Sequence, residues 1–256
     1  MTKQNYVLEA VHVTKRFRRS FFSAKTKEVL LDINLHLEQG RTVGLLGSSG
    51  CGKSTFAKIA NGMLRPEQGQ VSVMGQNPFE LDKKKLAKTI QMIFQQPEES
   101  FDPERQIGKS ILEPMQLHGI GTEAERKQKR AELMECMNLS EQLLTRYPHQ
   151  ISGGEAQRLA IVRALTLEPQ ILILDEPTSM LDVSTQAQIL NILKDLQSQR
   201  NLSYLFITHD SGAARWMCDE IAVMDQGHII EYGEAESLFQ NPQQEWTRKL
   251  LYAWDE

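Results

Sequence analysis

The chain has 256 residues, of which 40% are hydrophobic, so it is long enough for one large domain or two modest ones with a substantial core. Lys and Arg total 29 against 33 Asp and Glu, and the resulting formal charge of -4 excludes the strongly basic footprint that nucleic-acid binding leaves. The three cysteines, Cys51, Cys136 and Cys218, lack CxxC spacing, which argues against a disulfide framework or a zinc site and is typical of a reducing cytosol.

The sequence contains no segment that favours insertion into a membrane. Its first residues lack the long apolar run of a signal peptide. No window approaches the ~18 consecutive apolar residues that a membrane-spanning helix needs. We therefore expect a soluble protein that is attached to a membrane only through partners.

Two stretches near the start of the chain, residues 6–13 and 29–37, alternate partly between apolar and polar side chains. This alternation predicts antiparallel strands with one face in contact with water. Between them lies a basic and aromatic stretch from Arg16 to Lys27, which we predict to be a loop.

Three short apolar runs indicate a second kind of strand. They occupy residues 42–46, 171–174 and 204–207. Runs without alternation suit parallel strands that are covered on both faces. Each run is followed by a polar turn and a helical pattern, so the chain is predicted to contain βα units of a doubly wound sheet.

The middle and the end of the chain carry different patterns. Residues 101–150 contain charged helical stretches and no strong strand, so we predict a helical insertion. From about residue 220, the sequence to residue 233 resembles a β-hairpin, and a short helix containing Trp246 and Leu250 follows.

The segment after the first apolar run, residues 47–54, reads GSSGCGKS and fits the pattern G-x-x-x-x-G-K-[ST]. Its glycines let backbone N–H groups converge on an anion, and the following helix adds the positive end of its dipole. Lys53 supplies a charge for β- and γ-phosphates, and the Ser54 hydroxyl is an oxygen ligand suited to Mg²⁺. The alternative is a glycine-rich turn with an incidental lysine, and Cys51 is interpreted as a small loop residue. The predicted phosphate-binding residues are Gly47, Ser48, Ser49, Gly50, Cys51, Gly52, Lys53, Ser54 and Thr55.

Acidic and histidine side chains follow the other two buried runs. Asp175 and Glu176 end the run 171–174, at the carboxyl end of a strand, where ligands bind in such sheets. Asp175 is placed to hold Mg²⁺ directly or through water, and Glu176 to act as a general base on an attacking water. His209 ends another strand, where it could contact a γ-phosphate with Asp210 orienting it. The alternatives are two solvated acids in a turn and a structural histidine.

Six short motifs occur in one order along the chain: GSSGCGKS, Gln95 within MIFQQP, ISGGEAQR, ILILDEP, SMLD and ITHD. This set resembles that of the ABC ATPases. The resemblance implies an α/β fold, a P-loop NTPase core of the ABC type with an antiparallel β subdomain and a helical subdomain. It also implies that ATP and Mg²⁺ are the cofactors.

The resemblance implies one ABC ATPase domain over residues 1–256. Residues of about 1–100 and 160–235 would form the RecA-like core with the antiparallel β subdomain. Residues of about 101–159 would form the helical subdomain that carries the signature motif, and about 236–256 a short C-terminal helical tail.

Roles follow for individual positions from the same resemblance. Phe17 resembles the aromatic residue that stacks on adenine; the alternative is an ordinary exposed or core phenylalanine. Gln95 resembles the glutamine that senses Mg²⁺ and water and couples to a permease, although the adjacent Gln96 leaves its position open by one residue. Asp182 resembles the aspartate of the D-loop, which lies across a dimer interface.

Ser152, Gly153, Gly154 and Glu155 resemble the signature motif, which closes on the ATP of the other subunit. Glu155 stands where the family usually has Gln, so it cannot donate a hydrogen bond there, which puts the partner's site in doubt. Considered alone, Ser-x-x-Glu is also a capping box at the start of a helix.

The implied function is that of an ATP-hydrolysing subunit that powers an ABC importer by ATP-driven dimer closure. The segments RYPHQISGGEAQR and LFQNPQQEWTRKLL are similar to those of ATPases from importers of peptides, nickel or metal-chelator complexes. Such importers imply a second, non-identical ATPase subunit, two transmembrane permease subunits, an extracellular substrate-binding protein and no nucleic acid. The chain would lie at the cytoplasmic face of the cell membrane, held there by the permease. Alternatives are an exporter ATPase, a soluble ABC ATPase outside transport and a scaffold without turnover.

Overall fold

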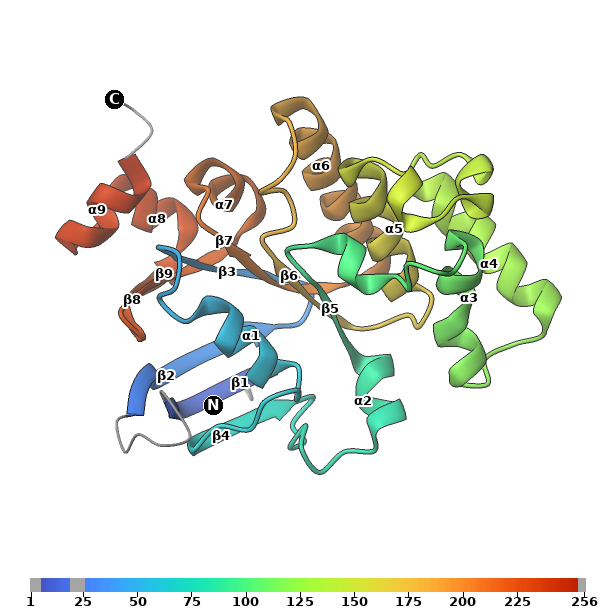
Figure 1. Cartoon of the computed structure of the whole chain (residues 1–256). Coiled ribbons are helices and arrows are strands. Elements are labelled where there is room, and N and C mark those ends of the chain that lie inside the picture. The colour runs from blue at the N-terminus through green and yellow to red at the C-terminus, as the bar shows by residue number, and fades with distance from the viewer. Residues whose placement is uncertain (1–5, 19–25, 253–256) are drawn as a thin grey trace.

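The computed structural model describes residues 6–18 and 26–252 (Figure 1). Its strands are β1 (Tyr6–Arg18), β2 (Thr26–Glu38), β3 (Thr42–Gly47), β4 (Gln68–Val73), β5 (Ile90–Ile93), β6 (Ile171–Asp175), β7 (Ser203–Thr208), β8 (Glu220–Asp225) and β9 (His228–Glu234). Its α-helices are α1 (Lys53–Ala60), α2 (Lys83–Thr89), α3 (Ile107–Leu117), α4 (Glu123–Cys136), α5 (Gly153–Leu165), α6 (Val183–Arg200), α7 (Ser211–Met217), α8 (Ala235–Gln240) and α9 (Glu245–Tyr252). Three short 3₁₀ helices are η1 (Pro97–Ser100), η2 (Glu141–Thr145) and η3 (Pro148–Gln150).

The larger sheet has the strand order β5-β6-β7-β3-β8-β9. Its strands are parallel except β9, which pairs antiparallel with β8. The three predicted apolar runs are β3, β6 and β7 and lie at its centre, so their prediction as buried parallel strands is confirmed. Two further parallel strands join them: β5, which we had not predicted, and β8, which we had predicted only as half of a hairpin.

Side chains of the central strands alternate between two hydrophobic cores because successive residues of a strand point to opposite faces. Ile171 and Ile173 of β6 pack into the core that contains α1 and the antiparallel sheet. Leu172 and Leu174 pack into the core formed with the helices α3 to α6. Burial on both faces explains why this strand is apolar throughout.

The smaller sheet is antiparallel, with the order β2-β1-β4. The strands β1 and β2 are longer than predicted, so the predicted loop from Arg16 to Lys27 is wrong at both ends: Phe17 pairs with Lys27 and Arg18 with Thr26. Bulges interrupt the β1–β2 register, which disturbs the two-residue period that sequence analysis depends on. Residues 19–25 of the predicted loop lie outside the described residues.

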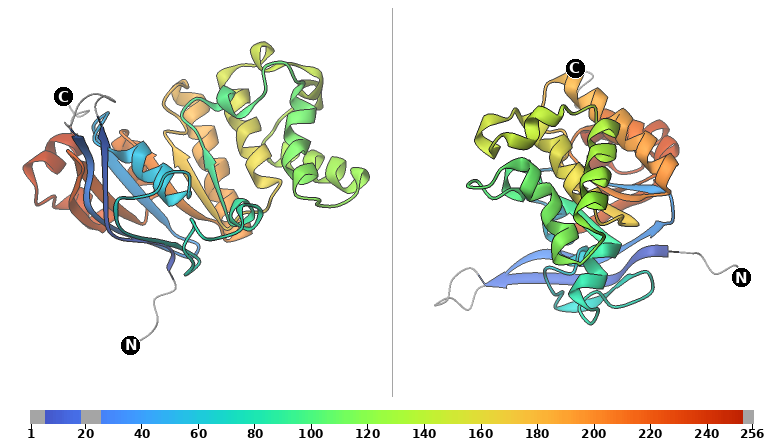
Figure 2. Two further views of the ribbon diagram at one scale, coloured as in Figure 1. Left: turned by 60° about the horizontal axis from the view of Figure 1, so that its bottom comes forward. Right: turned by 90° about the vertical axis from the view of Figure 1, so that its right-hand side faces the viewer.

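The helical insertion predicted at residues 101–150 is confirmed, since this stretch forms α3, α4, η2 and η3 without a strand. Together with α5 these helices gather at one end of the molecule, away from the antiparallel sheet (Figure 2). The predicted boundary near residue 159 falls inside α5, so the division into subdomains remains a proposal.

The C-terminal part contains the predicted β8–β9 hairpin, followed by two helices rather than one. Glu231 of β9 fixes the start of the second helix, because its carboxylate accepts hydrogen bonds from the backbone N–H groups of Gln243 (2.8 Å) and Gln244 (3.1 Å). Trp246 and Leu250 lie on α9 as predicted.

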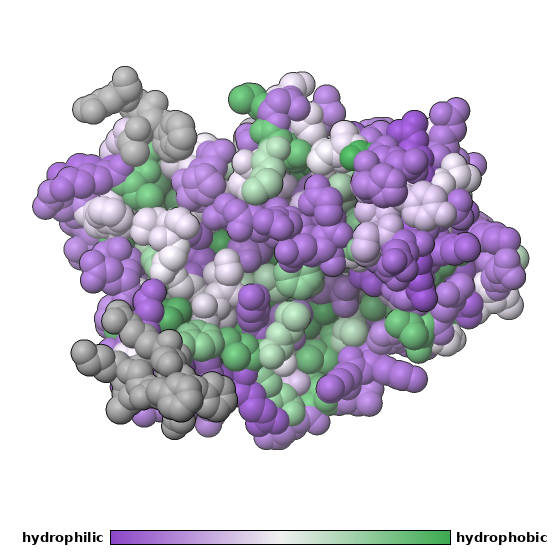
Figure 3. Space-filling model, viewed as in Figure 1, coloured by the Kyte–Doolittle hydropathy of each residue, from purple (hydrophilic) through white to green (hydrophobic). Residues whose placement is uncertain are grey.

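Hydrophilic side chains cover most of the face shown in Figure 3, with smaller apolar patches between them. Over the described ranges, none of the helices has the length and apolar character needed to span a bilayer. The architecture agrees with the predicted α/β fold class: a largely parallel sheet, a separate antiparallel sheet and a group of helices.

Candidate functional site

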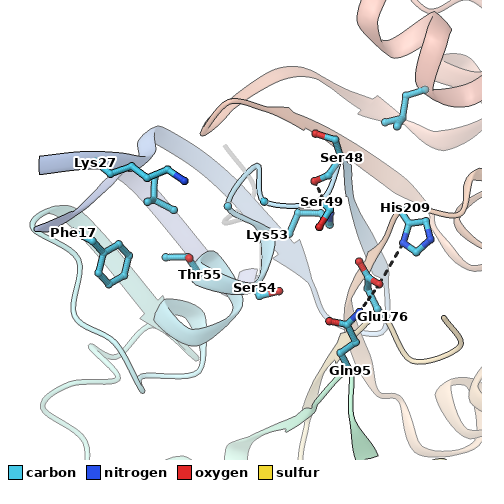
Figure 4. Close-up of a pocket in the computed structure, with 14 residues that line it drawn as sticks. Phe17, Lys27, Ser48, Ser49, Lys53, Ser54, Thr55, Gln95, Glu176 and His209 are labelled. Atoms are coloured by element: carbon cyan, nitrogen blue, oxygen red, sulfur yellow. Dashed lines mark hydrogen bonds and ion pairs between the residues drawn. The ribbon is translucent and has the colours of Figure 1, made fainter. Parts of the chain in front are cut away.

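A cavity of about 910 Å³ opens at the carboxyl edge of the large sheet, large enough for a nucleotide-sized ligand (Figure 4). It brings together most of the predicted site residues from distant parts of the chain. The residues that line it are Phe17, Lys27, Val29, Ser48, Ser49, Gly50, Gly52, Lys53, Ser54, Thr55, Gln95, Glu176, His209 and Leu250.

The loop between β3 and α1 has a backbone that requires glycine. Gly52 has φ of 121°, a region that residues with a side chain rarely adopt. A Cβ at Gly47 would lie 2.3 Å from the carbonyl oxygen of Met224 on the adjacent strand β8. The loop therefore packs closely against the sheet and leaves its opposite side open to the cavity.

Lys53 is buried within this loop, with only 5% of its surface exposed. Its ammonium donates hydrogen bonds to the carbonyl oxygens of Gly47 (2.8 Å) and Ser48 (3.0 Å). An ammonium group has three donors, so one remains for an anion in the cavity. The lysine therefore stabilises the loop through these two hydrogen bonds and also supplies the positive charge beside the cavity.

Cys51 is the one predicted loop residue besides Gly47 that does not line the cavity. Its side chain is buried beneath the loop, and this burial raises the pKa of the thiol, with nearby Lys53 acting in the opposite direction. A raised pKa leaves little thiolate at neutral pH. This agrees with the interpretation of Cys51 as a small loop residue.

The hydroxyl of Ser54 donates a hydrogen bond to Oδ1 of Asp175 at 3.2 Å, which joins the start of α1 to the end of β6. Asp175 is 5% exposed, and this burial raises its pKa while the bond from Ser54 lowers it. In the described part of the chain, no three His, Cys, Asp or Glu side chains gather closely enough to hold a metal by themselves. Mg²⁺ usually takes one or two protein oxygens together with substrate phosphates, so this pair fits it.

Glu176 presents its carboxylate to the cavity from a constrained backbone. Its φ is 49°, in the left-handed region, and its N–H donates to the carbonyl oxygen of Ile207 at 2.8 Å. Such a conformation in a residue other than glycine costs on the order of 1–3 kcal/mol and is typical of functional sites.

Two side chains hold the same carboxylate oxygen of Glu176. The Gln95 amide donates to Oε2 at 3.0 Å, and Nδ1 of His209 lies 3.3 Å from that atom. Of the two adjacent glutamines it is therefore Gln95, rather than Gln96, that reaches the cavity. Figure 4 shows these three side chains together opposite Ser48 and Ser49.

Asp210 has a different place from the one expected. Its Oδ1 accepts a hydrogen bond from the backbone N–H of Ala213 at 3.0 Å and so caps the start of α7. The imidazole of His209 faces Glu176 instead, so the expectation that Asp210 orients His209 is not met.

The predicted signature residues lie outside this cavity, at the start of α5. Ser152 and Glu155 form a reciprocal capping box: Ser152 Oγ accepts from the N–H of Glu155 at 3.3 Å, and Glu155 Oε2 accepts from the N–H of Ser152 at 2.8 Å. The capping interpretation is thus confirmed. The backbone bond from Ser152 is the main cause that lowers the pKa of Glu155.

Asp182, the predicted D-loop residue, also lies outside the cavity. It caps α6 by accepting from the N–H of Thr185 at 3.0 Å. Next to it, Met180 and Val183 are 68% and 82% exposed. Gly153 and Gly154 face this segment, since a Cβ on either would lie within 4 Å of Leu181. The two predicted interface motifs therefore form one continuous surface.

Lys27, Val29 and Leu250 line the cavity but were not predicted as site residues. Lys27 reaches it because β2 starts at Thr26, earlier than the predicted residue 29, and there pairs Lys27 with Phe17. Val29 begins the predicted strand, but the alternation in the sequence does not show that it faces a cavity. Leu250 reaches it through the packing of the C-terminal helix α9, for which the sequence offers no local signal.

The fold and the cavity define a P-loop nucleotide-binding protein with an acid, an amide and an imidazole beside the phosphate loop. Residues 30–179 match the family model described as ABC transporter. The chain belongs to the ABC transporter family, whose ATP-binding subunits hydrolyse ATP to power transport.

Named relatives agree with this assignment. The chain is 40% identical to the oligopeptide transport ATP-binding protein AppF of Bacillus subtilis (strain 168), over 97% of this chain and 78% of the relative. It is 38% identical to the dipeptide transport ATP-binding protein DppF of Haemophilus influenzae, over 96% of this chain and 77% of the relative.

Among solved structures, the dimeric ATP-binding cassette MJ0796 bound to ADP and Pi is 28% identical, with a TM-score of 0.80 over 89% of this chain and 98% of that chain. The structure of cbiO1 from Clostridium perfringens, at 24% identity, has a TM-score of 0.80 over 98% of this chain and 96% of that chain and supports the fold.

Proposed function

We propose that this chain is the ATP-hydrolysing subunit of an ABC importer for peptides. The observation that carries the proposal is a single cavity in which the phosphate loop around Lys53 faces a carboxylate, Glu176, that is held by Gln95 and His209. The relatives named for oligopeptide and dipeptide transport support the choice of cargo.

The loop residues bind the triphosphate in this proposal. Backbone N–H groups at the start of α1 and the remaining donor of Lys53 neutralise phosphate oxygens. Phe17, 41% exposed and at the other end of the cavity, supplies an aromatic face on which the base stacks. These contacts orient the terminal phosphate toward Glu176.

Ser54 and Asp175 would hold Mg²⁺, and Gln95, which lines the same cavity as Ser54, could add its side-chain oxygen. When bound, the ion supplies charge neutralisation at the phosphate oxygens. Glu176 accepts a proton from the attacking water as general base. Gln95 and His209 keep the carboxylate in place, and the imidazole can also donate to a γ-phosphate oxygen.

A second ATPase subunit completes each site in this proposal. The signature residues Ser152 to Glu155 and the D-loop Asp182 do not line the chain's own cavity, which supports their action on the ATP of a partner. The dimeric cassette bound to ADP and Pi offers a precedent among solved structures. Glu155 holds Ser152 rather than pointing freely outward, so it acts through the shape of the helix start.

We further propose that the partner subunit is non-identical and that two permease subunits and an extracellular binding protein complete the importer. The chain would then lie at the cytoplasmic face of the membrane, held by the permease. Export, a role outside transport and a scaffold without turnover are less well supported, because the relatives named here are transport proteins and the hydrolytic residues share one cavity.

The test is transport by the reconstituted complex in lipid vesicles. We expect ATP-dependent uptake of di- and oligopeptides delivered with the binding protein, and none with the Glu176→Gln variant. A panel that includes nickel and metal-chelator complexes separates the other importer cargoes. ATP-driven movement of cargo in the opposite direction, or turnover that no cargo stimulates, would contradict the proposal.

A further inference from the structure

Lys27 occupies the end of the cavity that lies away from the hydrolytic residues. It pairs directly with Phe17 across the β1–β2 ladder, and directly opposed residues of an antiparallel pair project to the same side of the sheet. Both line the cavity, and Figure 4 shows the Lys27 amine above Thr55, on the path from Phe17 to the phosphate loop.

Within the described residues, the ammonium of Lys27 forms neither an ion pair nor a hydrogen bond. The cationic groups next to it along the same two strands are engaged: Arg16 pairs with Glu28 at 2.9 Å, and Lys15 donates to the carbonyl oxygen of Arg65 at 2.9 Å. A free ammonium on the wall of a cavity attracts an anionic ligand group.

The order of residues along the cavity indicates which group that is. Lys53 and Glu176 lie at the end where the terminal phosphate reacts, whereas Phe17 lies where the base stacks. The α-phosphate is the phosphate nearest the base in any nucleotide. We propose that Lys27 binds the α-phosphate of the bound nucleotide, an inference that rests on the proposed ATP site.

A lysine that binds the α-phosphate and a lysine that binds the terminal phosphate should differ in which nucleotides they affect. ATP, ADP and AMP share the α-phosphate, so Lys27→Met should weaken all three by the same factor, about fivefold, and should leave adenosine unchanged. Lys27→Arg should restore most of the affinity, because it keeps the charge. The dependence of ATP affinity on salt should become less steep in Lys27→Met.

The experiment is titration of the purified chain with ATP, ADP, AMP and adenosine at several salt concentrations. Lys84→Met is the control, since Lys84 is an exposed lysine on α2 outside the cavity. Unchanged affinities in Lys27→Met, a loss confined to ATP, or an equal loss with adenosine would each overturn the inference. If the unmodified chain binds no ATP, the proposed function itself fails, whereas normal binding by both chains removes only the role of Lys27.

Discussion

Glu176 is the only acid among the described residues that line the cavity. We expect Glu176→Gln to keep ATP affinity within about twofold, because the loop around Lys53 is untouched. Turnover should fall at least about a hundredfold, because an amide cannot accept the proton of the attacking water. Calorimetry measures the binding and phosphate release measures the turnover.

The matched control for that substitution is Glu67→Gln, an exposed glutamate outside the cavity. It should leave both affinity and turnover at the level of the unmodified chain. Turnover by Glu176→Gln that equals the control would remove Glu176 from the role of general base.

Lys53 is the second single residue whose substitution tests the site, because it contacts the phosphate loop and would also contact the bound phosphate. Lys53→Ala removes the donor to the phosphates and both bonds to the loop carbonyl oxygens, so ATP affinity should fall about tenfold or more. Lys84→Ala should bind normally. Tight ATP binding by Lys53→Ala, measured by displacement of a fluorescent nucleotide, would contradict the phosphate-loop assignment.

Sequence patterns located the site residues whose chemistry depends on near neighbours. The phosphate loop, Asp175, Glu176 and His209 each follow a buried run directly, so their convergence at one sheet edge could be predicted. Lys27 and Leu250 could not, because strand pairing and the packing of the tail bring them to the cavity. Asp210 was assigned the wrong contact, since an acid beside a helix start can serve either the helix or a neighbouring side chain.

At the scale of elements, Glu231 connects the C-terminal hairpin to α9. Burial alone would raise its pKa, but hydrogen bonds that include those from the N–H groups of Gln243 and Gln244 outweigh it and lower the pKa. A carboxylate with a lowered folded-state pKa stabilises the fold above its unfolded pKa, and this contribution is lost as the pH falls through the folded value.

We therefore expect Glu231→Gln to lower the free energy of unfolding by about 1 kcal/mol at pH 7, the usual net contribution of an intramolecular hydrogen bond. The difference from the unmodified chain should shrink as the pH falls below about 4.5, the ordinary range of a glutamate. Thermal unfolding at pH 7 and pH 4 checks this, with Glu67→Gln as the control. A difference that grows toward acid pH would contradict this account of the Glu231 carboxylate.

Elements differ in how far the sequence predicts them. The strands β3, β6 and β7 were found because they are buried on both faces and therefore apolar throughout. The ends of β1 and β2 were missed because bulges disturb their alternation, with His12 and Asp32 both at positive φ. The strand β5 was missed because Gln91 interrupts its apolar run, so it lacks the uniform pattern of β6 and β7.

At the scale of the whole molecule, the cavity and the exposed segment near Asp182 are the two surfaces that we propose contact the partner subunit. In Glu176→Gln, ATP should be consumed only slowly, so Mg–ATP should hold this chain and its partner subunit together as a dimer. Val183→Glu adds a charge at an exposed position of that segment, and we expect it to prevent dimer formation while leaving the unfolding temperature unchanged.

Light scattering after size-exclusion chromatography measures the dimer with and without nucleotide. The exposed Lys84→Ala on α2 should dimerise normally. A dimer that forms equally well without ATP, or that tolerates Val183→Glu, would show that the segment near Asp182 does not contribute to a nucleotide-dependent interface.

The most direct measurement is the structure of Glu176→Gln bound to Mg–ATP. We predict the triphosphate against residues 47–54, the base on Phe17, and the terminal phosphate beside the side chain at position 176. A nucleotide bound anywhere else on the chain, or bound with its phosphates away from that loop, would contradict the assignment of this cavity as the site of ATP hydrolysis.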